Sequence, residues 1–161
     1  MGTTFGISHV AVGVSDIDRS LAFYRDLLGL RVTLDTTERI ESRSGKGNRR
    51  RAVYLRAGGD GGGSPHDFFI VLDQQLDREP FGSPPRLFQL GTHHFSFWID
   101  DVEDRAVAAQ QAGYEVVVIP TRSTPAAYGE AADAMPVLTT ILKDPDGNLV
   151  QLDQRLAGVT S

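Results

Sequence analysis

Short apolar stretches bounded by polar turns recur along most of the chain. The first, residues 7–14 (ISHVAVGV), is rich in β-branched residues and predicts a strand. Asp16 then precedes apolar positions at helical spacing, and Gly29 ends this predicted helix in the manner of a C-terminal glycine. Three further strands are predicted, at residues 30–41, 50–57 and 66–74. The glycine run between the last two strands leads into a strand rather than a helix, which favours a hairpin connection over a phosphate-binding loop.

A segment rich in proline and glycine, residues 78–90, separates this pattern from a second one. The second pattern begins with the predicted strand HHFSFWI. Asp100 or Asp101 then caps a predicted helix, and Gly113 ends it. Three strands complete the pattern, at residues 114–121, 137–144 and 147–154.

The two patterns are copies of one another. His9 lies over His94, 85 residues further on (94 − 9), and VLDQ at 71–74 lies over QLDQ at 151–154, 80 residues further on (151 − 71). Such self-similarity indicates a duplicated supersecondary unit, and neither copy is large enough to bury a sufficient core alone. The sequence therefore predicts an α+β fold: a single domain of two βαβββ modules related by a pseudo-twofold axis. The modules are residues 5–77 and 91–155.

Composition narrows the function classes. The net charge of −5 argues against nucleic-acid binding, which usually requires a basic face. No apolar run approaches the length of a membrane span, and the N-terminal residues do not resemble a secretory leader, so we expect a cytoplasmic protein without a membrane partner. Cysteine is absent, which excludes disulfides and thiolate metal sites. These features leave a small-molecule ligand as the expected partner.

Alternation along the strands brings candidate ligand-binding side chains together. His94 is predicted to share a face with Trp98, and His93 is predicted to point to the opposite face. The repeat places His9 opposite His94 across the pseudo-twofold axis. If the matching faces line one cavity, His9, His94 and Gln151 converge there.

Three segments carry a family resemblance: ISHVAVGVSDIDRSLAFYRDLLGL, HHFSFWIDDV and KDPDGNLVQL. Together, in order and in duplicate, they resemble the vicinal oxygen chelate superfamily. That superfamily includes glyoxalase I, extradiol dioxygenases, methylmalonyl-CoA epimerases and bleomycin-resistance proteins. The resemblance spans about residues 7–153 and implies curved mixed sheets that enclose a cleft for a small molecule. It also implies a homodimer.

In metal-dependent members, the ligands come from the first and last strands of each module. Carried onto this sequence, the resemblance implies His9, Val71, His94 and Gln151 at these positions. Valine cannot bind a metal, and Gln151 offers a neutral carbonyl oxygen where the family usually has glutamate. The implied cofactor is a divalent metal (iron, nickel, zinc or manganese) held by His9, His94 and Gln151.

Other candidates for the site come from resemblance and position. His66 resembles a histidine that extradiol dioxygenases carry before this strand, which implies an acid or base, although an exposed hairpin position is the simpler explanation. Tyr128 lies in a long irregular connection of the kind that covers active sites, and we treat it as a second catalytic candidate. Val71, Asp73 and Trp98 are candidate substrate-binding residues.

Two pairs of charged residues remain as further candidates. Asp73 and Asp153 are able to act as carboxylate ligands, although both are predicted at strand ends, where solvated aspartate is common. Arg86 and Arg122 are able to meet an anionic substrate, but exposed arginines need no such role.

Two functions follow from different classes. The first is a metal-dependent enzyme, similar to extradiol dioxygenases, that binds vicinal oxygens of a small oxygenated or aromatic metabolite. The second is a metal-free binding protein, similar to bleomycin-resistance proteins, that sequesters an antibiotic or metabolite. The histidine pair favours the first function, whereas Val71 and Gln151 favour the second.

Overall fold

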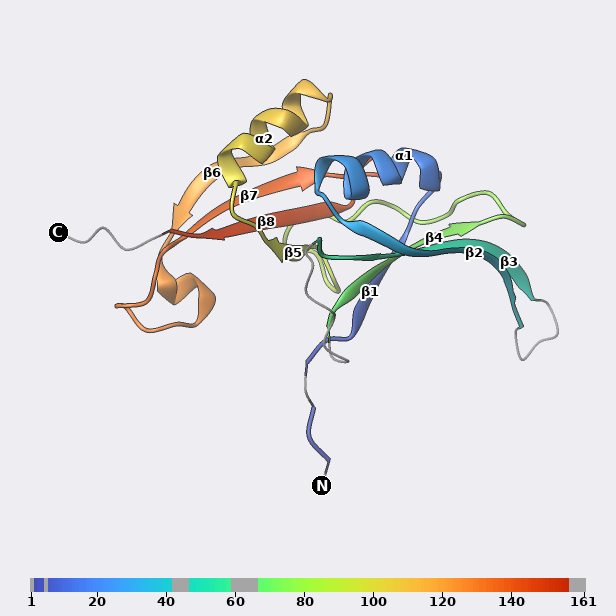
Figure 1. Cartoon of the computed structure of the whole chain (residues 1–161), viewed down its shortest axis with the longest axis horizontal. Coiled ribbons are helices and arrows are strands. Elements are labelled where there is room, and N and C mark those ends of the chain that lie inside the picture. The colour runs from blue at the N-terminus through green and yellow to red at the C-terminus, as the bar shows by residue number, and fades with distance from the viewer. Residues whose placement is uncertain (1, 5, 42–46, 59–66, 157–161) are drawn as a thin grey trace. The chain divides into compact units, whose positions relative to one another are not determined.

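The computed structural model describes residues 2–4, 6–41, 47–58 and 67–156. The chain divides into two compact units, Met1–Gly82 and Ser83–Ser161. Each unit contains one four-stranded mixed sheet with a helical segment between its first and second strands (Figure 1). The prediction of two βαβββ modules is therefore confirmed.

In the first unit, the outer strand β1 (His9–Gly13) runs parallel to β4 (Phe69–Gln75). The other neighbours pair antiparallel, which gives the order β1-β4-β3-β2, with β2 at Arg31–Ile40 and β3 at Asn48–Arg56. The helical segment comprises α1 (Ile17–Leu21) and η1 (Ala22–Leu27).

The first helix differs from the regular helix that the sequence predicts. Its second part, η1, is a π-helix, in which the Leu28 N–H donates to the Phe23 carbonyl, five residues back, at 2.9 Å. Phe23 and its neighbour Tyr24 are both fully buried. The wider turn lets two consecutive large side chains enter the same core, which the spacing of a regular α-helix disfavours.

The second unit repeats this arrangement in the order β5-β8-β7-β6. Again the first strand, β5, runs parallel to the last, β8, and the other pairs are antiparallel. The elements are β5 (Phe95–Trp98), α2 (Val102–Gln111), β6 (Val116–Ser123), the 3-10 turn η2 (Pro125–Tyr128), β7 (Val137–Lys143) and β8 (Leu149–Arg155).

Repeat-equivalent glutamines attach each helix to its sheet. The side-chain oxygen of Gln74 accepts from the Ile17 N–H at 3.2 Å, and that of Gln154 accepts from the Val102 N–H at 3.0 Å. Both glutamines therefore satisfy an N–H of a helical first turn, which has no partner within the helix. This shared contact is a structural counterpart of the VLDQ and QLDQ match.

The two predicted aspartate caps behave differently. Asp16 accepts hydrogen bonds from the backbone N–H groups of Asp18 and Arg19, as an N-cap does. Asp101 is the N-cap residue of α2 but makes no capping bond, because its carboxylate pairs with Arg105 at 2.7 Å.

The last strand of the second sheet divides apolar and polar side chains between the two faces of the sheet. Val150 and Leu152 of β8 are fully buried and alternate with Gln151 and Asp153. Helix α2 contacts β6, β7 and β8 from one side (Figure 1). Gln151 and Asp153 therefore point to the other face, where the candidate site lies. No helix in the described ranges is long and apolar enough to cross a membrane.

Candidate functional site

A buried aspartate is the centre of the polar face of the second unit. Asp153 is 3% exposed. Its carboxylate accepts hydrogen bonds from the Ser96 hydroxyl, from the Tyr128 hydroxyl at 2.7 Å, and from the Gln151 amide at 3.0 and 3.2 Å. Asp153 and its three donor residues are here called the Asp153 cluster. The neutral donors satisfy the hydrogen-bonding capacity of a buried carboxylate.

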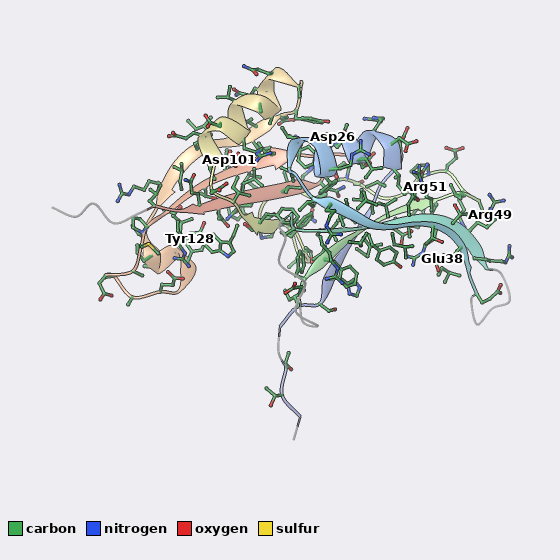
Figure 2. The ribbon with its side chains drawn as sticks, viewed as in Figure 1. Asp26, Glu38, Arg49, Arg51, Asp101 and Tyr128 are labelled. Atoms are coloured by element: carbon green, nitrogen blue, oxygen red, sulfur yellow. The ribbon has the colours of Figure 1, made fainter. Side chains whose placement is uncertain are left out.

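Strand register and one irregular segment build this cluster. Ser96 pairs with Gln151 and Trp98 with Asp153 between the parallel strands β5 and β8, so these side chains share one face. Tyr128 is the last residue of η2 (Pro125–Tyr128), and the C-cap residue Gly129 follows it with a left-handed φ of 70°. The side chain of Tyr128 extends from this turn to the sheet (Figure 2).

The environment keeps the Tyr128 hydroxyl protonated. Burial, and next the hydrogen bond to Asp153, raise the pKa of Tyr128 to about 12. A phenol with such a pKa remains a hydrogen-bond donor at neutral pH. This raised pKa favours hydrogen bonding by Tyr128 over proton transfer at neutral pH, and a catalytic role for Tyr128 stays a prediction.

The single tryptophan lies beside the cluster with its ring partly in water. Trp98 is 57% exposed, and its ring centroid is 5.9 Å from that of Tyr128. The guanidinium of Arg155 lies over the Trp98 ring at 4.6 Å, within the range of a cation–π interaction. Arg155 also donates to the carboxylate of Glu130 at 2.5 Å.

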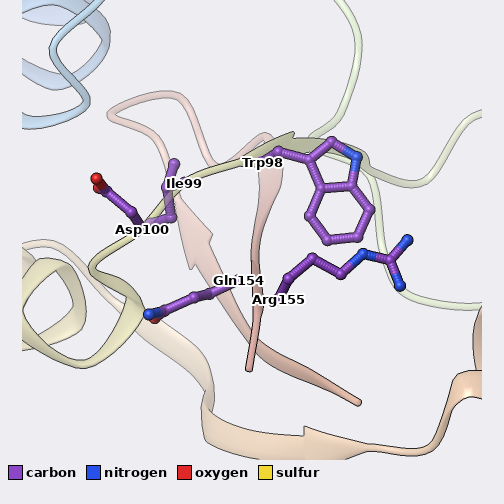
Figure 3. A pocket seen from close by; sticks show the side chains of 5 residues that line it. All are labelled: Trp98, Ile99, Asp100, Gln154 and Arg155. Carbon is purple, nitrogen blue, oxygen red and sulfur yellow. The ribbon is translucent and has the colours of Figure 1, made fainter. Parts of the chain in front are cut away.

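A pocket of about 540 Å³ adjoins this tryptophan. Figure 3 shows Trp98 and Arg155 side by side on one flank, with Asp100 and Gln154 extending from the other. Ile99 also lines this pocket, which we call the Trp98 site. Its residues come from the carboxyl ends of β5 and β8, so it combines an aromatic surface with charged and amide groups.

The two adjacent histidines lie together, contrary to the prediction that His93 points away from His94. Their Nδ1 atoms are 2.7 Å apart and their ring centroids 4.5 Å apart. The prediction applied strand alternation to both residues, but β5 begins only at Phe95. Partial burial, and then the neighbouring His93, lower the pKa of His94. The neutral imidazole of His94 is therefore favoured.

His9 has different surroundings in the first unit. Its ring stacks on Phe69, with centroids 5.0 Å apart and an interplanar angle of 14°. Its Nδ1 lies 2.9 Å from the Ser8 hydroxyl. Val71, another candidate on this face of the first sheet, is 5% exposed. His9 therefore lies in an aromatic environment, and Val71 belongs to the packed part of the sheet.

The repeat-equivalent aspartates are not solvated strand ends, as the sequence had suggested. Asp73 forms an ion pair with Arg50, which also pairs with Glu38 at 2.7 Å. Asp153 is buried within its cluster. Both carboxylates are held by hydrogen bonds on a face of their own sheet. The two repeat-equivalent aspartates therefore differ in their partners.

His66 and most of the glycine run before it lie outside the described residues. Six residues that the sequence did not assign to the site contribute to it: Ser96, Ile99, Asp100, Glu130, Gln154 and Arg155. Strand alternation contained a signal for Ser96, which shares the face of Trp98. Nothing in the pattern linked Glu130 to Arg155, 25 residues apart.

The residues in either unit alone do not fit a metal centre. The described ranges contain no group of three or more His, Asp or Glu side chains arranged around a common point. His9 and His94 belong to different units. Gln151 turns its amide nitrogen to Asp153 and offers a neutral oxygen in place of the charged carboxylate that a divalent metal prefers.

Comparisons with solved structures agree with the fold. A glyoxalase family protein from Bacillus cereus is 14% identical, with a TM-score of 0.72 and 97% of each chain covered. An antibiotic-binding protein from a Streptomyces species is 20% identical, with a TM-score of 0.61 and 97% of this chain and 100% of that chain covered. A lactoylglutathione lyase from Agrobacterium tumefaciens is 21% identical, with a TM-score of 0.55 and 95% and 96% covered.

At these identities the solved structures establish a shared fold and no shared activity. The search of curated proteins gave no match. The model of the Glyoxalase/Bleomycin resistance protein/Dioxygenase superfamily matches residues 6–152. This match covers both modules and confirms the resemblance that the three sequence segments carry. The chain therefore belongs to the glyoxalase/bleomycin resistance protein/dioxygenase superfamily, also called the vicinal oxygen chelate superfamily.

Proposed function

We propose that this protein binds a planar small molecule with hydrogen-bonding groups at the Trp98 site and does so without a metal. The observation that carries the proposal is the exposure of the Trp98 ring, 57%, beside a pocket of about 540 Å³. A large aromatic side chain that remains in water next to a pocket of ligand-binding size is typical of a recognition surface.

The polar groups around the ring suit an oxygenated aromatic ligand. Gln154 uses its amide oxygen to hold Val102, and its NH₂ group donates no hydrogen bond within the described ranges, so it is available to a ligand. Arg155 provides further N–H donors, and Asp100 provides an acceptor at the opposite flank. The superfamily fold is shared with an antibiotic-binding protein, which supports sequestration of a metabolite or antibiotic as the biological use.

The cluster behind the ring supports the site without entering it. Tyr128 contacts both Asp153 and Trp98, so it limits the positions that the indole ring adopts. We assign Tyr128 a positioning role rather than a catalytic one. Val71 and Asp73 belong to the other unit, and their role in substrate binding stays a prediction.

Intrinsic fluorescence tests the proposal, because the chain contains a single tryptophan. Titration with catechols, naphthols and anthraquinones is expected to quench its emission saturably. Calorimetry is then expected to show at least tenfold weaker binding for Trp98→Leu. Phe88→Leu, a change at another exposed aromatic residue of the same unit, is the matched control. Equal affinity of Trp98→Leu and the unaltered protein would refute the proposal.

A metal-dependent enzyme, similar to extradiol dioxygenases, is the second candidate. It is favoured by the lowered pKa of His94, because neutral imidazole is the form that binds metals, and by the repeat-equivalent His9. Elemental analysis of protein purified without chelators distinguishes the two functions. Stoichiometric iron, nickel, zinc or manganese that is lost in both His9→Ala and His94→Ala would replace the first proposal with the second. The homodimer remains a prediction, which sedimentation tests directly.

A further inference from the structure

A second pocket of the Ser83–Ser161 unit lies apart from the Trp98 site. It has a volume of about 460 Å³ and is formed by residues 83–87 together with Val117, Lys143 and Leu149. None of these residues lines the Trp98 site. We call it the linker pocket, because one wall is the proline-containing segment that precedes the second module.

The proline-containing wall of the linker pocket packs against a tight turn. A Cβ added to Gly147 would lie 2.9 Å from the Cβ of Pro84, so the proline packs directly on the glycine. Gly147 has a φ of 86°, and its N–H donates to the Asp144 carbonyl at 3.0 Å. The Asp144 carboxylate also accepts from the Asn148 N–H at 2.8 Å. The turn is therefore well braced, and the linker has a defined place on it.

The lining of the linker pocket combines apolar surface with positive charge. Val117, Leu87 and the prolines supply apolar surface over the buried Leu149, and no acidic residue lines the pocket. Lys143 is already paired with Glu115 at 2.8 Å. Within the described ranges, no ion pair or side-chain hydrogen bond engages the guanidinium of Arg86. Arg86 is thus the cation that remains available to a ligand.

We propose that the linker pocket binds a small amphipathic anion: an aliphatic or aromatic carboxylate whose apolar body lies against Leu149 and Val117 and whose carboxylate meets Arg86. The fork of a guanidinium matches a carboxylate with two parallel hydrogen bonds. The structure also distinguishes between Arg86 and Arg122, which the sequence offered equally as partners of an anionic substrate. Arg86 lines this pocket, whereas Arg122 lies five residues beyond Val117 on β6, about 17 Å along the strand, and lines neither pocket.

The test uses octanoate as the anion and octanol as its uncharged counterpart, added to the whole protein and followed by backbone amide NMR. Octanoate is expected to shift the amides of Arg86, Leu87, Val117 and Leu149, and to bind at least tenfold more tightly than octanol. Arg86→Gln is expected to weaken octanoate binding about tenfold and to leave octanol unchanged. Arg122→Gln is the matched control and is expected to leave both unchanged.

Two further variants separate the pocket from general surface charge. Val117→Phe is expected to obstruct the pocket and reduce octanoate binding, whereas Val107→Phe, on the exposed face of α2, is expected to have no effect. Circular dichroism establishes that each variant is folded. Equal binding of octanoate and octanol, equal effects of Arg86→Gln and Arg122→Gln, or shifts that gather at Trp98 instead would each overturn the proposal. Because the two pockets share no residue, these results are independent of ligand binding at the Trp98 site.

Discussion

The guanidinium of Arg155 lies 4.6 Å from the centroid of the Trp98 ring, and it also donates to the carboxylate of Glu130 and to the Met135 carbonyl. The last strand is thereby linked to both the aromatic surface and the irregular segment after η2. We expect Arg155→Met to change the emission maximum of Trp98 and to release Glu130. Arg122→Met, at a position that lines neither pocket, is the control. An unchanged emission spectrum in Arg155→Met would contradict the cation–π contact.

The same link predicts an acid transition that Trp98 reports. Hydrogen bonds from Arg155 hold the pKa of Glu130 below its ordinary value. For a carboxylate whose folded pKa is depressed, the stabilisation is present above the unfolded pKa and is lost as the pH falls through the folded pKa. Trp98 emission is therefore expected to change below about pH 4.5. Glu130→Gln is expected to abolish this step, and a persisting step would assign it to another group.

Tyr128 is expected to titrate later than an ordinary tyrosine. Its pKa is raised to about 12, and the chain has 4 tyrosines. Ultraviolet absorbance should therefore show one phenol ionising well above pH 10, a component that Tyr128→Phe removes. Because the folded pKa lies above the unfolded one, its stabilising contribution is complete below about pH 10 and is lost as the pH rises through 12. Loss of an early-titrating phenol in Tyr128→Phe would contradict this assignment.

Asp153 is expected to matter more for stability than its repeat equivalent. Asp153→Ala leaves the Ser96, Tyr128 and Gln151 donors without their acceptor in a buried place, and we expect a loss of about 2–4 kcal/mol in the free energy of unfolding. Asp73→Ala leaves Arg50 paired with Glu38, and about 1 kcal/mol is expected. Urea denaturation of both variants measures the difference. Equal losses would show that the donors of the Asp153 cluster find other partners.

Gln151→Glu tests whether the site is close to a metal centre. The substitution replaces the amide that donates to Asp153 with a second carboxylate, so the metal-free protein is expected to lose about 1–2 kcal/mol of stability. A divalent ion relieves such repulsion, so nickel or zinc should raise the melting temperature of this variant more than that of the unaltered protein. Gln154→Glu, at the residue that holds α2 instead, is the control. Equal responses would separate Gln151 from any metal site.

The sequence predicted the modules because duplication supplies information that periodicity alone lacks. The first and last strands of each module were short and ambiguous by themselves, but their counterparts, 85 and 80 residues away, had the same pattern. The π-helical turn was not predictable in this way. It follows from the burial of both Phe23 and Tyr24, which depends on the shape of the core against which they pack.

The site was predicted less completely, for physical reasons that differ from residue to residue. Alternation holds only within a paired strand, so it failed for His93, which precedes β5. Tyr128 was chosen from the irregular segment by loop length, but its contact with Asp153 requires a turn that closes onto the sheet. Arg155 follows the last match of the repeat, and its stacking on Trp98 is a contact between strands that no local pattern encodes.

The two repeat-equivalent aspartates allow the same position to be compared between the two units of this protein. Asp73 is neutralised by an arginine of its own sheet, whereas Asp153 is held by neutral groups beside a solvent-facing indole. The same position of the repeat is thus held by a charged partner in one unit and by neutral donors in the other. A substitution made in one unit therefore has its natural counterpart in the other, which serves as an internal control for the effect of those partners on stability.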